Sequence, residues 1–306
     1  MAVSEPIARP AAEQVAVRVR GMPPRRWLRE VGWRYLVAGA AVLFALFPIA
    51  WILSASINPI DNLTAARLVP PGITLDSYQQ LFRNPLAPFG RWLFNTLKIA
   101  LVGAILIVSL SALASYSFSR LRWRGRRGGL LTLLLVQIFP NWLAFVAIFL
   151  LLIQIGGIFP TFGLGTHAGL ILVYLGGALG VNTWLLKGFM DSIPYSLDEA
   201  AVVDGASNWQ VFTRVILPLA RPVLAVIFLL TFISLYGEYI LAAVILRDAD
   251  QYTMAVGLQL FVQSEYTAKW GQLAAAAVIG AFPITLVWLV MQDQIVSGLT
   301  QGAVKG

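Results

Sequence analysis

The side chains that could take part in chemistry are few in this 306-residue chain, and they lie far apart. Glu238, within Tyr236-Gly237-Glu238-Tyr239, is the only acidic residue deep inside a long apolar run. An ionised carboxylate at mid-membrane costs about 2.5–3.5 kcal/mol on insertion scales. We therefore expect Glu238 to face a polar cavity, where it would accept hydroxyl hydrogens from a ligand between the rings of Tyr236 and Tyr239. The alternative is a structural hydrogen bond to a partner subunit.

Two further polar positions lie inside apolar runs. Asn141 and Trp142 follow Phe139-Pro140, where a proline kinks or opens a helix. They either line a cavity or serve ordinary helix packing. Asn182, close to several glycines, could equally bind a ligand or hydrogen-bond between helices.

Several classes of chemistry are excluded by what the chain lacks. It has no cysteine, so disulfides, thiolate metal sites and cysteine nucleophiles are excluded. The single histidine, His167, follows a glycine-containing turn, and one such ligand rarely makes a metal site. No G-x-x-x-x-G-K-[S/T] phosphate loop is present, so another chain would have to hydrolyse any ATP that drives the protein. We expect no catalytic residue, no metal and no cofactor on this chain.

One polar stretch, Ser196–Pro218, stands between two apolar runs and has helix-start signals. Ser196 with Glu199, and Ser207 with Gln210, have the spacing of capping boxes. Gly205 falls where the first short helix must end, a place that favours a left-handed backbone. The stretch predicts a helix–turn–helix bracket on one side of a membrane, suited to docking a partner.

The elements that carry these residues are membrane helices. The chain is 58% hydrophobic and 12% charged, with mean hydropathy +0.77, whereas soluble domains are about 25% charged. A spanning helix needs about 20 apolar residues. We predict an all-α integral membrane protein with six transmembrane helices, within Tyr35–Ile57, Trp92–Ser119, Gly128–Ile158, Ala168–Leu186, Pro222–Leu246 and Trp270–Gln292.

The distribution of lysine and arginine predicts the orientation. With the N-terminus inside, the segments 1–34, 120–127, 187–221 and 293–306 hold sixteen of these residues and the outer segments hold five. Both termini and the bracket are therefore expected on the cytoplasmic face. The net charge of +8 reflects this bias, so no nucleic-acid partner is expected.

Three regions follow from these patterns. Residues 1–33 are predicted to be a disordered cytoplasmic segment, because they mix Pro, Ala, Arg and Glu without helical periodicity. Residues 34–292 form the transmembrane domain, with the bracket at 194–218, and 293–306 form a cytoplasmic tail. The first span is too long for a signal peptide and is expected to be an uncleaved anchor.

The bracket resembles the EAA loop of bacterial ABC importer permeases, whose pattern is E-A-A, three residues, G, nine residues, I, one residue, L-P. Val215 stands here at the isoleucine position. An amphipathic interfacial helix would not explain the caps, the glycine and Leu217-Pro218 together. The tail Gly298–Gly306 is similar to the C-terminal end of the permeases in this family that carry carbohydrates. Gln137–Pro140 and Trp270–Ala277 resemble the second membrane subunit of maltose/maltodextrin importers.

This resemblance implies the type I ABC importer (MetI-like) permease fold in a multi-pass protein of the bacterial cytoplasmic (inner) membrane. It implies a transport subunit, not an enzyme, that forms half of an alternating-access pathway. The implied partners are a second, MalF-like permease subunit, two ATPase subunits that bind ATP and Mg, an extracytoplasmic sugar-binding protein and membrane lipid. The ATPase-coupling residues would be Glu199, Ala200, Ala201, Asp204, Gly205, Leu217 and Pro218, and the ATPase-contacting tail residues Gly298, Thr300, Gln301 and Lys305.

Other substrates and another machine remain as alternatives. The same importer type could carry trehalose, another oligosaccharide or glycerol phosphate. A neutral gluco-oligosaccharide fits the aromatic and amide side chains better than an anion, which a carboxylate at position 238 would repel. A secondary transporter would need an ion-coupling network and often an inverted repeat, and neither is visible in the sequence.

Overall fold

The computed structural model describes residues 23–60, 67–138, 141–262 and 269–303, all built from helices and the loops between them. The chain divides into two units, residues 1–50 and 51–306. The first unit holds α1 (Pro24–Trp27), a π-helical turn η1 (Leu28–Gly32) and most of α2 (Trp33–Ser56). Residues 1–22 of the predicted disordered segment lie outside the described part. The rest of that segment is helical, supported by stacking of Trp27 on Tyr35 at 5.8 Å between ring centroids.

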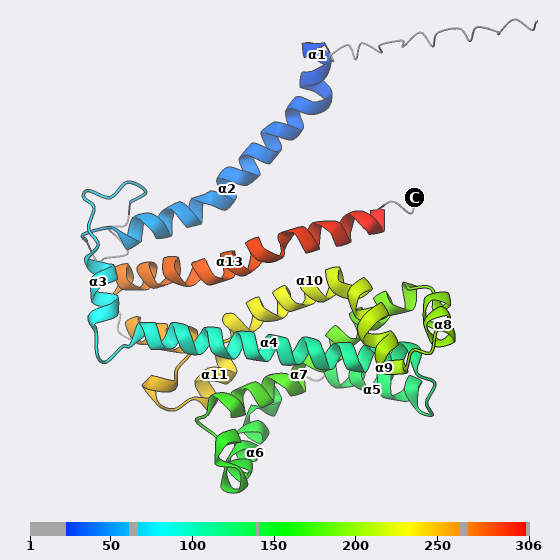
Figure 1. The fold of residues 1–306 in the computed structure, drawn as a ribbon. Coiled ribbons are helices and arrows are strands. Elements are labelled where there is room, and N and C mark those ends of the chain that lie inside the picture. Colours follow the sequence, from blue (N-terminus) through cyan, green and yellow to red (C-terminus); the bar gives the residue numbers. More distant parts are fainter. Residues whose placement is uncertain (1–22, 61–66, 139–140, 263–268, 304–306) are drawn as a thin grey trace, which may run out of the picture. The chain divides into compact units, whose positions relative to one another are not determined.

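Three long helices build the interior of the second unit (Figure 1). They are α4 (Phe89–Arg120), α7 (His167–Ser192) and α10 (Leu217–Tyr236), and α4 packs against both others. Small side chains such as Ala100 and Ala104, both fully buried, let α4 approach its neighbours closely. Ser115 of α4 donates to the Thr183 carbonyl of α7 at 2.8 Å. The central helices are thus joined by close apolar packing and by polar bonds.

A second group of contacts fixes the segment that follows α11 (Ile240–Ile245) onto α4. This segment contains η6 (Ala249–Gln251), α12 (Met254–Leu258) and η7 (Gln259–Phe261). The Trp92 indole donates to the Ala249 carbonyl at 2.7 Å, and the Asn95 amide donates to the Asp250 and Tyr252 carbonyls at 2.9 and 3.1 Å. The Met254 amide donates to Thr96 Oγ1 at 2.7 Å. Four contacts therefore hold residues 249–254 along one turn of α4.

The predicted number of six spanning helices is not confirmed. The described part contains four membrane-length apolar helices, 28–56, 89–120, 208–236 and 270–295, or five if α7, bent by 53°, is one span. The predicted third span, Gly128–Ile158, is divided into α5 (Arg126–Ile138), η3 (Asn141–Ala144) and α6 (Phe145–Ile158). The division falls between Ile138 and Asn141, and residues 139–140 lie outside the described part.

The predicted span Pro222–Leu246 is also interrupted. It begins within a continuous helix, since α9 (Asn208–Gln210) and the π-helical η5 (Val211–Ile216) run directly into α10. The helix ends at Gly237, and α11 starts only at Ile240. Glu238 is therefore at a helix break and not in the middle of a helix. Its hydrogen bonds, described below, give the physical reason for this break.

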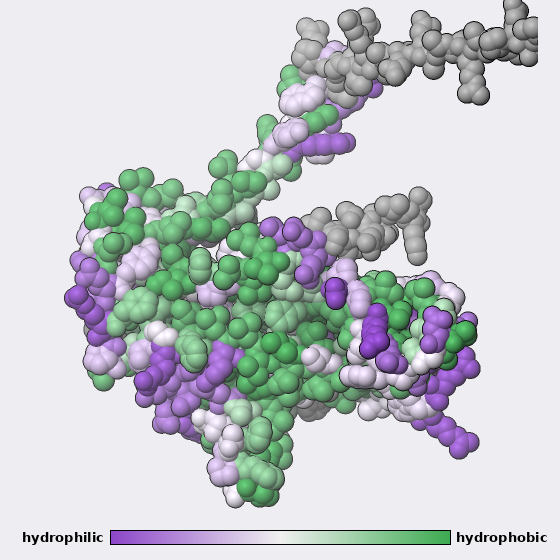
Figure 2. All heavy atoms as spheres, in the orientation of Figure 1, coloured by the Kyte–Doolittle hydropathy of each residue, from purple (hydrophilic) through white to green (hydrophobic). Residues whose placement is uncertain are grey.

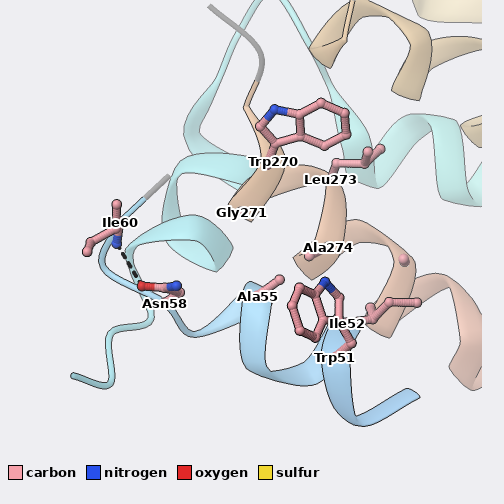
Figure 3. A pocket seen from close by; sticks show the side chains of 10 residues that line it. Trp51, Ile52, Ala55, Asn58, Ile60, Trp270, Gly271, Leu273 and Ala274 are labelled. Atoms are coloured by element: carbon pink, nitrogen blue, oxygen red, sulfur yellow. Dashed lines mark hydrogen bonds between the residues drawn. The ribbon is translucent and has the colours of Figure 1, made fainter. Parts of the chain in front are cut away.

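The last helix, α13 (Trp270–Ala303), is longer than its apolar run and includes most of the predicted tail. Its start contacts α3 (Asp76–Arg83), where the Gln272 amide donates to Gln80 at 2.8 Å. Beside it is an apolar pocket of about 210 Å³ between the end of α2 and the start of α13 (Figure 3), lined by Trp51, Ile52, Ala55, Asn58, Ile60, Trp270, Gly271, Leu273, Ala274 and Ala277. Hydrophobic residues cover the visible flanks of the long helices, whereas hydrophilic ones gather near α8 (Tyr195–Val203) and α9 (Figure 2).

Candidate functional site

The bracket between α7 and α10 consists of α8, a tight turn and α9. The predicted first capping box is wrong. Helix α8 begins at Tyr195, directly after Pro194, and no side chain caps it. Ser196 is already inside the first turn, because Pro194 takes the N-cap position and the helix starts two residues earlier than the motif predicts.

The second half of the bracket agrees with the prediction. Gly205 has a φ of +85°, in the left-handed region, and a Cβ added there would meet no atom within 4 Å. Its conformation, and not its space, therefore requires glycine. The Ser207 side chain accepts from the Gln210 amide at 3.3 Å, and the Gln210 side chain accepts from the Ser207 amide at 2.8 Å. Both bonds of the capping box are present.

The bracket presents both a hollow and apolar side chains to its surroundings. The hollow has a volume of about 310 Å³ and is lined by Ala201, Asp204, Gly205, Ala206, Gln210, Arg214 and Val215. Val203 is 86% exposed and Trp209 is 62% exposed, although both are large apolar residues. Glu199 and Ala200 are exposed as well, whereas Leu217 and Pro218 are half-buried in the start of α10. Large apolar side chains exposed on such a bracket are typical of a surface that binds a partner.

A buried ion pair joins this bracket to the end of α4. Arg120 Nε lies 2.6 Å from Asp198 Oδ2 of α8, and the two side chains are only 4% and 15% exposed. The Arg120 guanidinium also donates to the Ile193 carbonyl at 2.9 Å and lies 4.2 Å from the centroid of the Tyr195 ring. Arg120 thus binds the chain immediately before α8 as well as α8 itself.

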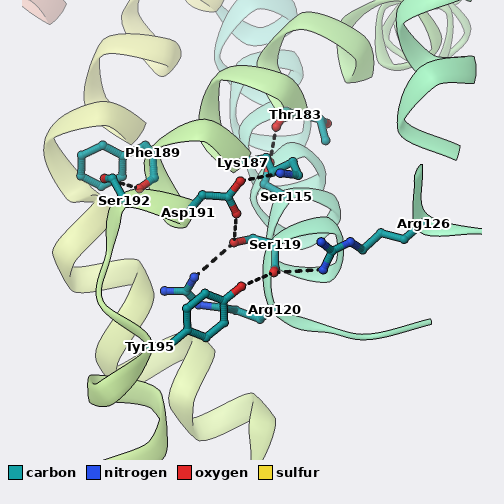
Figure 4. Close-up of polar contacts among 10 residues, drawn as sticks. All are labelled: Ser115, Ser119, Arg120, Arg126, Thr183, Lys187, Phe189, Asp191, Ser192 and Tyr195. Carbon is teal, nitrogen blue, oxygen red and sulfur yellow. Dashed lines mark hydrogen bonds and ion pairs between the residues drawn. The ribbon is translucent and has the colours of Figure 1, made fainter. Parts of the chain in front are cut away.

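Further polar contacts lie around Arg120 (Figure 4). Ser119 Oγ donates to Asp191 Oδ1 at 2.6 Å, and Lys187 forms an ion pair with the same carboxylate. The Tyr195 hydroxyl donates to the Ser119 carbonyl at 2.9 Å. Burial raises the pKa of Asp198, Arg120 opposes this effect, and the neighbouring Glu199 adds to it. The end of α4 is therefore linked to α7 and to α8 by one continuous network.

Glu238 is the centre of a second candidate site, inside the helical bundle. Its Oε2 accepts from the Tyr174 hydroxyl at 2.5 Å and from the Ala242 amide at 3.0 Å, and its Oε1 accepts from the Leu241 amide at 2.8 Å. The carboxylate therefore caps the backbone amides at the start of α11. This capping explains why the chain can break at Gly237 without leaving those amides unsatisfied.

Tyr174 and Glu238 lie on the wall of an open cavity of about 530 Å³. Residues of α5, α6, α7, α10 and α11 line it, and Glu238 is the only charged one among them. A smaller cavity of about 270 Å³ adjoins it and shares the wall residues Gln137, Gly177, Ser234 and Leu235. Together they make a hollow with hydroxyl, amide and carboxylate groups on otherwise apolar walls, as ligand sites commonly have.

Two of the other predicted pathway residues, Tyr236 and Tyr239, do not line this hollow. Tyr236 is buried and its hydroxyl donates to the Gly280 carbonyl of α13 at 2.8 Å. Tyr239 is 38% exposed and does not line either cavity. The side chains of Asn141 and Trp142 lie outside the described residues. Asn182 does line the smaller cavity, where its amide donates to Thr231 Oγ1 at 3.3 Å.

The structure places His167 fully and the predicted tail residues only in part. His167 Nε2 lies 2.8 Å from the Gln251 carbonyl, so this histidine connects α7 to η6. Of the tail residues, Gly298, Thr300 and Gln301 belong to the backbone of α13, and Lys305 lies outside the described part, as do all of their side chains.

Sequence reasoning missed Tyr174, Gln137 and Ser234 as residues of the hollow. Each is one polar residue in an apolar run, which was the signal that singled out Glu238 and Asn182. A systematic search of the apolar runs for hydroxyl and amide side chains would have found them.

The chain is similar to known membrane transport proteins over almost its whole length. A family model described as "Binding-protein-dependent transport system inner membrane component" matches residues 107–301. The maltose/maltodextrin transport system permease protein MalG of Photorhabdus laumondii is 39% identical over 289 residues, which cover 90% of this chain and 97% of that protein. MalG of Escherichia coli K12 is 39% identical over 272 residues, covering 85% of this chain and 91% of that protein.

Two solved structures also resemble the chain. One is a crystal structure of a bacterial ABC transporter involved in the import of the acidic polysaccharide alginate. It has a TM-score of 0.73 and 25% identity, and covers 89% of this chain and 99% of that chain. The other, of the alginate transporter in complex with an alginate pentasaccharide-bound periplasmic protein, has a TM-score of 0.59 and 18% identity, covering 87% of this chain and 96% of that chain.

Proposed function

Because this chain belongs to the family of binding-protein-dependent transport system inner membrane components, we propose that it is a membrane subunit of an importer of maltose or maltodextrin. The observation that carries the proposal is the 38–39% identity to MalG proteins over 85–95% of the chain. It is a multi-pass protein of the inner membrane and has a transport role rather than an enzymatic one. Membership of this family argues against the alternative that the chain is a secondary transporter.

The cavity around Glu238 supports a neutral sugar as the substrate. Its walls offer the Tyr174 hydroxyl, the Gln137 amide and the Glu238 carboxylate, and the described lining residues include no lysine or arginine. A negative charge on the wall of the cavity repels an anionic ligand. This argument disfavours glycerol phosphate and an acidic polysaccharide, but it does not separate maltose from trehalose.

The bracket supports coupling to ATPase subunits. Its Glu199–Ala201 segment is on α8, which is joined by Asp198 to the end of α4. A movement imposed on α8 would therefore reach α4, which lines the smaller cavity through Ile107. In this proposal the exposed Val203 and Trp209 contact the ATPase directly. Both termini then lie on the cytoplasmic side with the bracket.

The remaining partners follow from the same family. A second, MalF-like permease subunit would complete the pathway, and a periplasmic binding protein would deliver the sugar. The residues after Gly298 would reach the ATPase pair. Deleting them should leave insertion intact and weaken the assembly of the ATPase subunits, as measured by co-purification. Unchanged assembly and unchanged ATP hydrolysis would show that the tail makes no such contact.

The test of the substrate is uptake by the complete importer, reconstituted in vesicles with its own binding protein. Labelled maltose competes with an unlabelled maltodextrin, trehalose, glycerol phosphate or an alginate oligosaccharide. We expect maltodextrins to compete and both anions to fail. Preference for an anion would overturn the charge argument, whereas preference for trehalose would change only the sugar.

A further inference from the structure

The loop between α4 and α5 forms a hollow whose walls are rich in arginine. The hollow has a volume of about 620 Å³, and its lining residues are Arg122, Trp123, Arg124, Gly125, Arg126, Arg127 and Gly128. None of these residues is acidic, and the first turn of α5 contains no acidic residue either. Four guanidinium groups thus surround one solvent-accessible space without a carboxylate among them.

Nearby carboxylates do not neutralise this charge. Asp198 is paired with Arg120, and Asp191 is paired with Lys187. Arg126 donates to the Ser119 carbonyl at 3.3 Å, which fixes one edge of the loop. In the part of the chain that the structure describes, the exposed Arg122, Arg124 and Arg127 have no ion pair. These side chains are therefore available to an anion from outside the chain.

The position of the hollow indicates the source of that anion. Arg120 is the last residue of α4, a helix of 32 residues that contains a span-length apolar stretch, so the loop follows that stretch on one side of the membrane. Trp123 is 40% exposed and packs against Phe118 with 5.4 Å between ring centroids. Tryptophan concentrates at the level of lipid headgroups. The hollow therefore opens at headgroup depth.

Both helices that meet at this loop also offer apolar surface beside it. Leu113 of α4 is 43% exposed, and Leu131 and Leu135 of α5 are 59% and 65% exposed. A lipid whose phosphate entered the hollow could lay its acyl chains along these residues. A free phosphate ion would gain nothing from them.

We propose that this arginine loop binds the headgroup of an anionic phospholipid. Guanidinium groups hold phosphate oxygens in bidentate pairs, which a lysine cluster would not reproduce. The anion would also offset the unfavourable placement of Arg126 and Arg127 in the first turn of α5, since positive charge there opposes the helix dipole. Anionic lipids are abundant in the leaflet that arginine-rich loops face. This inference is independent of the sugar that the importer carries.

The test measures lipid selectivity of the complete importer in phosphatidylcholine vesicles that contain a trace of spin-labelled lipid. The fraction of motionally restricted label is compared for phosphatidylglycerol and phosphatidylcholine probes. We expect Arg122→Gln/Arg124→Gln to lower the preference for phosphatidylglycerol by roughly five-fold for each arginine at low ionic strength. Arg122→Lys/Arg124→Lys keeps the charge, so it should lower the preference for phosphatidylglycerol only by the part that comes from bidentate hydrogen bonds.

Arg29→Gln/Arg34→Gln is the matched control, because it removes two arginines at the start of another membrane helix, and neither of them lines the arginine hollow. Equal losses in both double variants would overturn the proposal, since general surface charge would then explain the selectivity. Loss of the preference on addition of inorganic phosphate would also overturn it, by showing a free-anion site. If the loop variant released the ATPase subunits and left lipid selectivity unchanged, the loop would be a protein contact and the proposal would be wrong.

Discussion

The ion pair between Arg120 and Asp198 gives the sharpest test of how the bracket is held. We predict that Asp198→Ala destabilises the protein and weakens the coupling between ATP hydrolysis and transport. The substitution leaves the Arg120 guanidinium with the Ile193 carbonyl and the Tyr195 ring but without its counter-charge. Because Arg120 is 4% exposed, water cannot readily replace the lost carboxylate.

The expected magnitude follows from this burial. Removal of one partner of a buried ion pair costs about 3–5 kcal/mol, because the other charge stays buried and uncompensated. Asp198 is 15% exposed and not fully buried, so we expect a value near the lower end, about 3 kcal/mol. The exposed pair between Arg26 and Glu30 is the control. Its side chains are 67% and 48% exposed, so Glu30→Ala should cost only about 0.3–0.5 kcal/mol.

Two measurements are needed, one on the subunit alone and one on the assembled importer. The first is the free energy of unfolding of the purified subunit in detergent micelles. The second is the number of sugar molecules transported for each ATP hydrolysed after reconstitution. The double variant Arg120→Met/Asp198→Leu should regain much of the stability, since a well-packed apolar pair often replaces a buried ion pair without loss. A cost for Asp198→Ala as small as that for Glu30→Ala, together with normal coupling, would refute the reasoning.

Three further outcomes are expected. Gly205→Val forces a β-branched residue into a left-handed backbone at about 1–2 kcal/mol, so sugar uptake should fall while membrane insertion stays normal; normal uptake would contradict this. Ser207→Ala removes a helix cap and should lower the free energy of unfolding by about 1 kcal/mol, whereas Ser207→Gly should lower it by only a few tenths. Tyr174→Phe should raise the KM for sugar uptake, because Glu238 loses one of its hydrogen-bond donors; Tyr236→Phe should instead lower stability with an unchanged KM, because its hydroxyl bonds to α13.

The sequence predicted those features that depend on neighbouring residues. The left-handed Gly205 and the capping box of Ser207 and Gln210 are local, since each is set by the residues within one helical turn. The apolar runs likewise predicted the long helices, because length and hydropathy are properties of a single segment. The wrong prediction at Ser196 is local too, because Pro194, two residues earlier in the chain, sets the start of that helix.

The features that could not be predicted depend on residues far apart in the chain. Tyr174 and Glu238 are 64 residues apart, and their hydrogen bond is what makes a carboxylate acceptable at a break in an apolar run. Asp198 and Arg120 belong to different helices, and the sequence around each residue does not indicate that it pairs with the other. The spacing of residues within one helix shows which of them share a face, but not which other helix that face will contact.

The four contacts that hold residues 249–254 on α4 have a consequence for binding. A loop that is loose before it is bound loses backbone and side-chain conformational entropy when a partner orders it. Residues 249–254 lose this conformational entropy earlier, when the chain folds, because they are hydrogen-bonded to the side chains of Trp92, Asn95 and Thr96. Whatever touches residues 249–254 meets a pre-organised surface, so more of the contact free energy remains as affinity.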